Sequence, residues 1–210
     1  MEFWKASHPD DALVAIDARS GEQWCYLDLR RDVARVQQTL PALGRKSLGL
    51  LVAQNRYECL VTYLAALNSG SALILVDTSL NPQLLHEFIA AYEPDWIYTL
   101  QAKGHFDGYH ASHSGVEGLL ENQEPRDLEM HPELALLLTT SGSTGSPKLV
   151  RLTLRNLAVN AQSIAQYLRL TPTERPITSL PLSYSYGLSV INSHLTAGAS
   201  LLFTEDGVLQ

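Results

Sequence analysis

The stretch that decides the fold reads SLGLLVAQNRYECLVTYLAALNSGSALILVD and spans residues 47–77. Its first seven residues, SLGLLVA, form a continuous apolar run, which is typical of a β-strand covered on both faces. Residues 57–68 carry a helical pattern that Gly70 ends, and ALILVD (72–77) is a second buried strand. A strand, a helix and a strand in this order form a βαβ unit, so the stretch predicts parallel strands in one sheet.

The same alternation continues on both sides of this stretch. Short strands are expected at 12–17 and 24–27, ahead of a helix at 29–43. Downstream we expect helices at 82–92, 153–168 and 187–196. We expect strands at 95–100, 133–140, 176–180 and 199–203. Residues 101–132 are polar, so we expect surface strand and loop there, and a candidate sub-boundary within one domain of residues 1–210. The predicted fold class is α/β, with a largely parallel, doubly wound sheet and flanking helices.

Composition excludes several classes of protein. The chain has 210 residues, 45% hydrophobic and 18% charged, which supports a packed core and rules out disorder, collagen and coiled coils. Its 15 basic and 22 acidic residues give a net charge of −7, which argues against a nucleic-acid partner. The N-terminus lacks the apolar run of a signal peptide, and the longest uncharged stretch (60–76) is too short to span a membrane, so a cytoplasmic location is expected. Cys25 and Cys59 lie in apolar surroundings and are expected to be buried, reduced thiols.

The residues most informative about chemistry directly follow a predicted buried strand. The segment TTSGSTGSPK (139–148) is rich in hydroxyl side chains and contains Gly142, Gly145 and Lys148. Glycines let backbone N–H groups approach an anion, hydroxyls donate hydrogen bonds, and lysine supplies a positive charge. Because ligands of open α/β sheets bind at the carboxyl ends of strands, the segment predicts a polyphosphate cradle. The alternatives are a flexible turn and a Walker A loop; the latter does not fit, since only two residues separate the glycines and Leu149 follows the lysine.

This cradle segment resembles the phosphate-binding signature of the adenylate-forming superfamily, which includes acyl-CoA synthetases, luciferases and nonribosomal peptide adenylation domains. The family pattern T-S-G-[ST]-T-G-x-P-K-G is matched at every position from Thr140 to Lys148 and departs at Leu149, where the family usually has glycine. In a weaker match, Tyr184 takes the place where the family has an aromatic residue or histidine three residues after a proline. The weaker resemblances occur in the family's order, at residues 24–40, 64–82 and 181–203.

The resemblance implies an enzyme that activates a small carboxylic acid with ATP and Mg²⁺. The products would be an acyl-adenylate and pyrophosphate, and the acyl group would then pass to the thiol of CoA or of the phosphopantetheine on a carrier protein. By resemblance, Tyr184 would wall the acyl pocket and Thr144 would contribute to the Mg²⁺ site. The β- and γ-phosphates would be held by Thr140, Ser141, Gly142, Ser143, Thr144, Gly145 and Lys148.

Other family signatures are missing from the sequence. The motifs Y-G-x-T-E and T-G-D do not occur, and neither does the small C-terminal domain with its catalytic lysine. The chain therefore resembles the amino-terminal part of a longer enzyme, and we expect the fragment alone not to form acyl-adenylates. Its PLSYSYG motif (181–187) is closer to the CoA-ligase pattern. An amino-acid or aryl-acid adenylation domain that loads a carrier protein is the first alternative, and a non-catalytic binding module is the second.

Two further expectations concern metals and assembly. His105, His110 and His113, with Asp107 between them, lie in the irregular segment without cysteines or a helical i, i+4 pair. We expect them to be solvated loop residues and not metal ligands. A partial sheet exposes an edge or an apolar face, which would favour self-association of the fragment.

Overall fold

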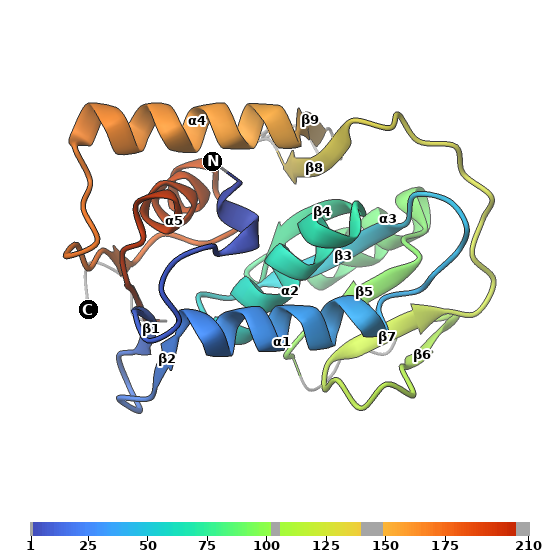
Figure 1. The fold of residues 1–210 in the computed structure, drawn as a ribbon. Coiled ribbons are helices and arrows are strands. Elements are labelled where there is room, and N and C mark those ends of the chain that lie inside the picture. Colours follow the sequence, from blue (N-terminus) through green and yellow to red (C-terminus); the bar gives the residue numbers. More distant parts are fainter. Residues whose placement is uncertain (1, 102–105, 140–148, 205–210) are drawn as a thin grey trace.

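A computed structural model describes residues 2–101, 106–139 and 149–204. In this part of the chain, helices pack on two sheets (Figure 1). The larger sheet has seven strands in the order β6-β7-β5-β3-β4-β8-β9. The central strands are mutually parallel, namely β5 (Trp96–Tyr98), β3 (Leu48–Ala53), β4 (Ala72–Asp77) and β8 (Leu134–Thr139). The outer strands pair antiparallel, namely β6 (Tyr109–Ala111), β7 (Leu119–Asn122) and β9 (Leu149–Thr153).

Helices cover both faces of this sheet, as the continuous apolar strands predicted. α1 (Tyr26–Thr39) and α2 (Tyr57–Ser69) belong to the core on one face, and α3 (Pro82–Tyr92) belongs to the core on the other. Successive strand residues point to opposite faces, so Leu51 packs in the first core and Leu50 in the second, and both are fully buried. The α/β fold class predicted from the sequence is confirmed.

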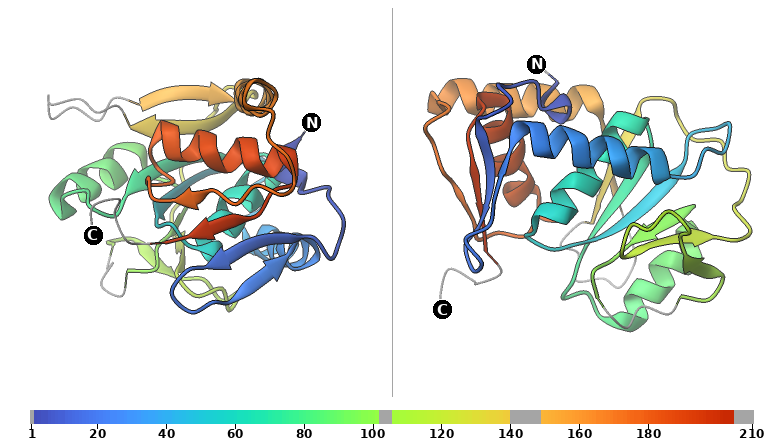
Figure 2. Two further views of the ribbon diagram at one scale, coloured as in Figure 1. Left: turned by 90° about the vertical axis from the view of Figure 1, so that its left-hand side faces the viewer. Right: turned by 60° about the horizontal axis from the view of Figure 1, so that its bottom comes forward.

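A second sheet brings together distant parts of the chain. Its strand order is β10-β11-β1-β2, and β1 runs parallel to β11 with Ala15 opposite Leu201. Figure 2 shows β11 (red) beside β1 (blue). The strands are β1 (Leu13–Asp17), β2 (Gln23–Cys25), β10 (Ile177–Thr178) and β11 (Leu201–Phe203). All four were expected as strands, but local patterns did not separate them from the main sheet, because pairing between distant strands depends on where the intervening helices place them.

Of the two further α-helices, α4 (Leu154–Leu168) connects the large sheet to the second sheet and α5 (Ser185–Ala197) connects two strands of the second sheet, β10 and β11. The two helices pack against each other.

The limits of the first helix differ from the prediction. α1 begins directly after Cys25, because Asp28 accepts hydrogen bonds from the Cys25 backbone N–H and Sγ, both at 3.0 Å, and caps the first turn. It ends earlier than expected because Pro41 disfavours a helical Leu40, which is extended.

Strand β9 was missed by the sequence analysis, which expected no element between the cradle segment and the helix that follows. It pairs antiparallel with β8, with Thr139 opposite Leu149. Thr139 and Leu149, the two residues that flank 140–148 in the sequence, therefore lie side by side at the carboxyl end of β8.

The structure also bears on two smaller expectations. Strands β6 and β7 lie within the irregular segment 101–132, where surface strand was expected; the candidate sub-boundary there stays a prediction. Cys59 is buried as expected, whereas Cys25 is only partly buried.

Gly49 in β3 is explained by packing: a Cβ there would lie 2.1 Å from the Trp96 ring, so only glycine lets the neighbouring strand bring that indole so close.

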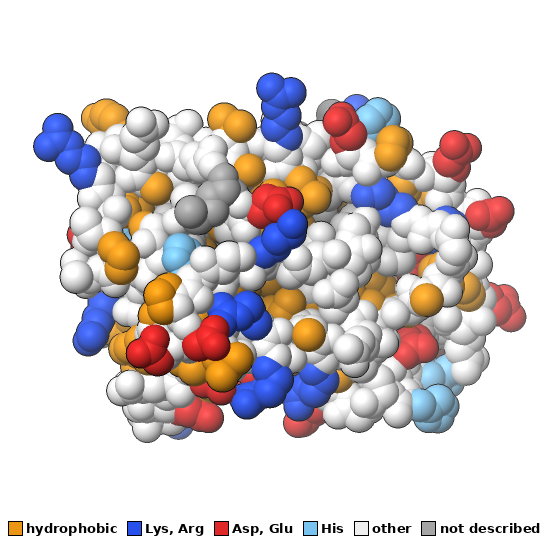
Figure 3. Space-filling model, in the orientation of Figure 1, with side chains coloured by type: hydrophobic (Ala, Val, Ile, Leu, Met, Phe, Trp, Pro, Cys, Tyr) orange, Lys and Arg blue, Asp and Glu red, His pale blue; other side chains and the backbone are white. Residues whose placement is uncertain are grey.

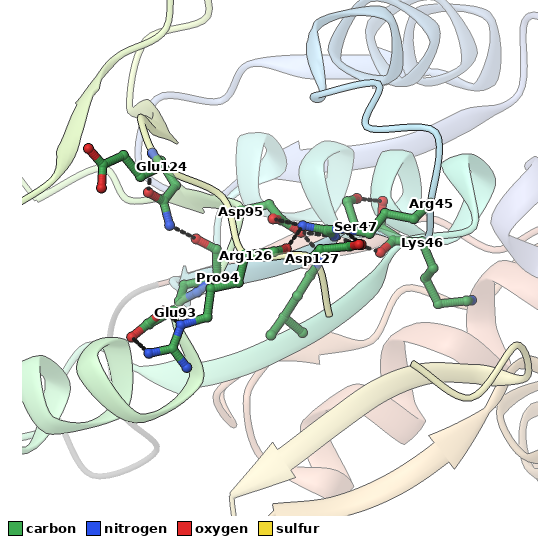
Figure 4. Close-up of polar contacts among 12 residues, drawn as sticks. Arg45, Lys46, Ser47, Glu93, Pro94, Asp95, Glu124, Arg126 and Asp127 are labelled. Atoms are coloured by element: carbon green, nitrogen blue, oxygen red, sulfur yellow. Dashed lines mark hydrogen bonds and ion pairs between the residues drawn. The ribbon is translucent and has the colours of Figure 1, made fainter. Parts of the chain in front are cut away.

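A polar network closes the amino-terminal edge of the large sheet (Figure 4). The Asp95 carboxylate is only 4% exposed and accepts hydrogen bonds from the Arg45 guanidinium at 2.8 and 3.0 Å and from the Leu48 N–H at 2.7 Å. Bonding to Asp95 raises the pKa of Arg45. Lys46 Nζ donates to carbonyls at the end of α2 and the start of β8, at 2.8 and 2.9 Å, and burial lowers its pKa. The polar side chains at the amino-terminal ends of these strands thus form hydrogen bonds to other groups of the protein.

The surface charges are mixed on the face seen in Figure 3. Blue and red side chains lie interspersed there, and ion pairs along α1 join Arg31 to Asp28 at 2.9 Å and Arg35 to Asp32 at 3.7 Å.

Candidate functional site

The candidate site lies at the carboxyl ends of β4 and β8, which are neighbours in the parallel part of the sheet. Both strands end in polar residues, Asp77 and Thr139, and the cradle segment follows the second of them. A hollow of about 660 Å³ opens there, and we call it the strand-end hollow. Its lining consists of Asp77, Leu138, Thr139, Val150, Leu152, Pro181, Ser183, Tyr184 and Ser185. This is the edge at which open α/β sheets bind their ligands.

Asp77 joins β4 to the segment that leads into α5. One carboxylate oxygen accepts a hydrogen bond from Ser183 Oγ at 3.0 Å, and the other accepts one from the Ser79 backbone N–H at 2.8 Å. Because Ser183 is buried, the bond fixes the chain directly before Tyr184. The sequence analysis did not single out Asp77, although an acidic residue at the end of a buried strand was a signal that could have found it.

Asn55 holds the same segment from the end of β3. Its Nδ2 donates to the carbonyl oxygens of Thr178 and, at 3.1 Å, Leu180, while its Oδ1 accepts from the Leu182 N–H at 3.0 Å. These bonds satisfy backbone groups that lie between β10 and α5. Asn55 was also missed by the sequence analysis, because nothing in its local sequence indicates that it contacts residues more than 120 positions away.

Tyr184 is the N-cap residue of α5, lines the strand-end hollow and is 54% exposed. This position is compatible with the predicted role at an acyl pocket, which stays a prediction. The glycine of the PLSYSYG motif has a steric reason: a Cβ on Gly187 would lie 2.3 Å from the Pro181 carbonyl oxygen. The first turn of α5 can therefore fold back against the motif's own proline only with glycine at that position.

A second hollow, of about 400 Å³, adjoins the first between α4 and α5, and we call it the interhelix hollow. The two share Leu138, Leu152 and Ser185, so they lie side by side. The remaining lining residues are Asn156, Leu157, Asn160, Leu188, Ser189 and Asn192. Both hollows combine apolar walls with a few polar side chains, which is the usual make-up of a small-molecule site.

The residues predicted to hold phosphate, Thr140, Ser141, Gly142, Ser143, Thr144, Gly145 and Lys148, lie outside the described residues, as does His105. Of the other histidines considered above, His110 and His113 are exposed. No group of three or more His, Cys, Asp or Glu side chains suited to a metal ion occurs within residues 2–101, 106–139 and 149–204. In the same part of the chain, no helix has the length and apolarity that crossing a membrane requires.

Comparison with known proteins identifies relatives over nearly the whole chain. A CoA ligase of Gibberella moniliformis is 24% identical over 235 residues, which cover 96% of this chain and 38% of that protein. The non-ribosomal peptide synthetase CmlP of Streptomyces venezuelae is 27% identical over 198 residues, which cover 87% of this chain and 20% of that protein. The chain thus spans less than half the length of these relatives.

Solved structures show the same fold. ATP-bound MatB from Rhodopseudomonas palustris superposes with a TM-score of 0.76 at 23% identity, covering 98% of this chain and 45% of MatB. A variant of E. coli MenE with bound OSB-AMS gives a TM-score of 0.76 at 20% identity, covering 98% of this chain and 46% of MenE. The sequence pattern of the family described as AMP-binding enzymes matches residues 1–209. This chain therefore belongs to the AMP-binding enzyme family, also called the adenylate-forming enzymes, and corresponds to the N-terminal part of its members.

Proposed function

We propose that the chain is the phosphate- and acyl-binding part of an ATP-dependent ligase that activates a carboxylic acid and passes it to a thiol. The observation that carries the proposal is the adjoining pair of hollows at the carboxyl ends of β4 and β8. The cradle segment connects Thr139 to Leu149, which are paired residues of β8 and β9. Thr139, directly before the cradle segment, and Val150, the second residue after it, both line the strand-end hollow.

Each group of residues has a physical task in this proposal. Hydroxyls, backbone amides and Lys148 of the cradle segment would hold the β- and γ-phosphates of ATP, with Thr144 beside the Mg²⁺ that accompanies them. As the carboxylate oxygen attacks the α-phosphorus, negative charge accumulates on the departing pyrophosphate. Donors already in place there stabilise the transition state, and loss of one such donor typically costs ~3 kcal/mol. Tyr184 would stand between the nucleotide and the acyl group.

The acceptor thiol and the state of the fragment belong to the same proposal. The CoA ligase relative supports CoA as acceptor, and the peptide synthetase relative supports the alternative, a carrier protein. We place the reaction in the cytoplasm. Because the chain spans less than half of these relatives, we expect it to bind nucleotide without completing adenylation, and an ATP–pyrophosphate exchange assay that detects turnover would contradict this.

Calorimetry with ATP and Mg²⁺ tests the cradle directly. We expect the 210-residue chain to bind the nucleotide and Lys148→Ala to weaken binding by at least about tenfold, because hydrogen bonds to charged groups are worth ~1.5–3 kcal/mol. Lys5→Ala is the control, since Lys5 lies in the short helix η1 (Phe3–Lys5) with its side chain 54% exposed. Equal affinities for the wild type and Lys148→Ala, or no binding at all, would refute the phosphate-binding role.

A further inference from the structure

The interhelix hollow has a lining that is polar but uncharged. It combines four leucines with three asparagines and two serines, and none of these described residues carries a charge. A hydrocarbon chain needs no asparagine side chains, and a charged substituent loses hydration that a neutral lining does not replace. The lining therefore favours a neutral group that forms hydrogen bonds.

Asn192 contributes a buried amide to this lining. It belongs to α5, is 3% exposed, and has both Nδ2 and Oδ1 near the Tyr63 hydroxyl, at 3.2 and 3.3 Å. An amide carries two N–H donors and two acceptor lone pairs. Because one hydroxyl meets at most one of each kind, Asn192 keeps hydrogen-bonding capacity for a ligand.

Asn160 and Ser189 supply a second polar group across the hollow, on α4 and α5. Ser189 Oγ donates to Asn160 Oδ1 at 3.2 Å, and this bond does not use the Asn160 amide NH₂. The third asparagine differs, because Asn156 Oδ1 accepts from the Thr153 N–H and hydroxyl, both at 3.0 Å, and caps α4. Asn156 therefore stabilises the start of α4, and Asn192 and Asn160 are the residues that can bond a ligand.

Burial makes Asn192 the selective group of this lining. A site built to hydrogen-bond its substrate rejects an analogue that lacks the polar group, because a buried hydrogen-bonding group is then left unpaired, and Asn192 is only 3% exposed. Asn160 is exposed and adds a hydrogen-bonding group from α4. We propose that the activated acid ends in an uncharged hydrogen-bonding group, such as an amide or hydroxyl, which Asn192 and Asn160 recognise.

This inference rests on the proposed function, and three acids of nearly equal shape test it. Glutaramate ends in an amide, 5-methylhexanoate in two methyl groups, and glutarate in a second carboxylate. Each is titrated into the ¹⁵N-labelled chain while the side-chain amide NMR signals of asparagine are followed. We expect glutaramate to shift the Asn192 and Asn160 signals and to bind at least about tenfold more tightly than either analogue.

Substitutions separate recognition from folding. Asn160→Leu should remove the preference for glutaramate, because the amide that would bond the ligand is lost. The variant should still fold, because the Asn160 side chain is exposed and a helix tolerates leucine. Asn192→Leu leaves the Tyr63 hydroxyl unpaired, so it is made together with Tyr63→Phe, which removes both partners. Asn68→Leu is the control, because Asn68 contacts the Trp4 carbonyl and not the hollow.

The outcomes distinguish this inference from the proposed function. Tighter binding of 5-methylhexanoate or glutarate, or no amide shift with any acid, overturns the inference while calorimetric binding of ATP and Mg²⁺ leaves the proposed function standing. Failure of nucleotide binding overturns the proposed function itself, and with it this assignment.

Discussion

Replacing Asn55 by alanine should lower the free energy of unfolding more than the same replacement at Asn68, which is also partly buried. The substitution removes three hydrogen bonds, two donated to carbonyl oxygens and one accepted from the Leu182 N–H. At ~1 kcal/mol of net stability per bond, the expected loss in the free energy of unfolding is about 3 kcal/mol. Asn68→Ala is the matched control, because Asn68 is also partly buried but donates a single bond, at 2.9 Å, to the Trp4 carbonyl. It should lose about 1 kcal/mol.

Urea unfolding followed by far-ultraviolet circular dichroism measures both variants. With a slope of roughly 2–3 kcal/mol/M for a chain of this size, the difference of about 2 kcal/mol separates the two midpoints by roughly 1 M. Equal slopes are needed, since a change in slope would signal a change in the unfolded state. Midpoints within about 0.2 M of each other would refute the view that Asn55 fastens the segment between β10 and α5 to the end of β3.

Two other predictions concern buried charge and alkaline pH. Asp95→Ala should lower the free energy of unfolding in urea by about 3 kcal/mol, which is the lower end for a broken buried ion pair, because the Arg45 side chain is 18% exposed. The control Lys5→Ala, which breaks an exposed ion pair, should lower it by less than about 0.5 kcal/mol. A loss below about 1 kcal/mol for Asp95→Ala would contradict the role of the network. Burial raises the pKa of Tyr26 well above its usual value of 10.0, so its contribution is fully present below pH 10 and is lost as pH rises further, when the unfolded chain ionises first. Between pH 10 and 11 the unfolding free energy should fall by about 1 kcal/mol less in Tyr26→Phe than in the wild type, whereas equal decreases would show that Tyr26 titrates normally.

The local features of this protein were largely readable from its sequence. The apolar runs at 47–53 and 72–77 are buried strands because their length and both-sided hydrophobicity leave no alternative that buries them equally well. Proline and glycine positions marked helix ends, and the error at the end of α1 came from the extended Leu40 that Pro41 imposes. The cradle segment pointed to the family without any structure, since residues 140–148 match the family's phosphate-binding signature.

Contacts between distant residues could not be read in this way. Asn55 does not stand out locally, and the acidic strand end that marks Asp77 does not reveal its partner Ser183. Each nevertheless bonds the segment before α5, and the interhelix hollow exists only where α4 and α5 meet. The sequence by itself determined the central strands and most of the helices, because backbone propensity and hydrophobic period act over a few residues, whereas β9 was missed. The polyphosphate ligand of the cradle stays a prediction. Only the tertiary structure decided that β1, β2, β10 and β11 form a second sheet and that Asn192 and Asn160 share one hollow, because such pairings depend on how the whole core packs.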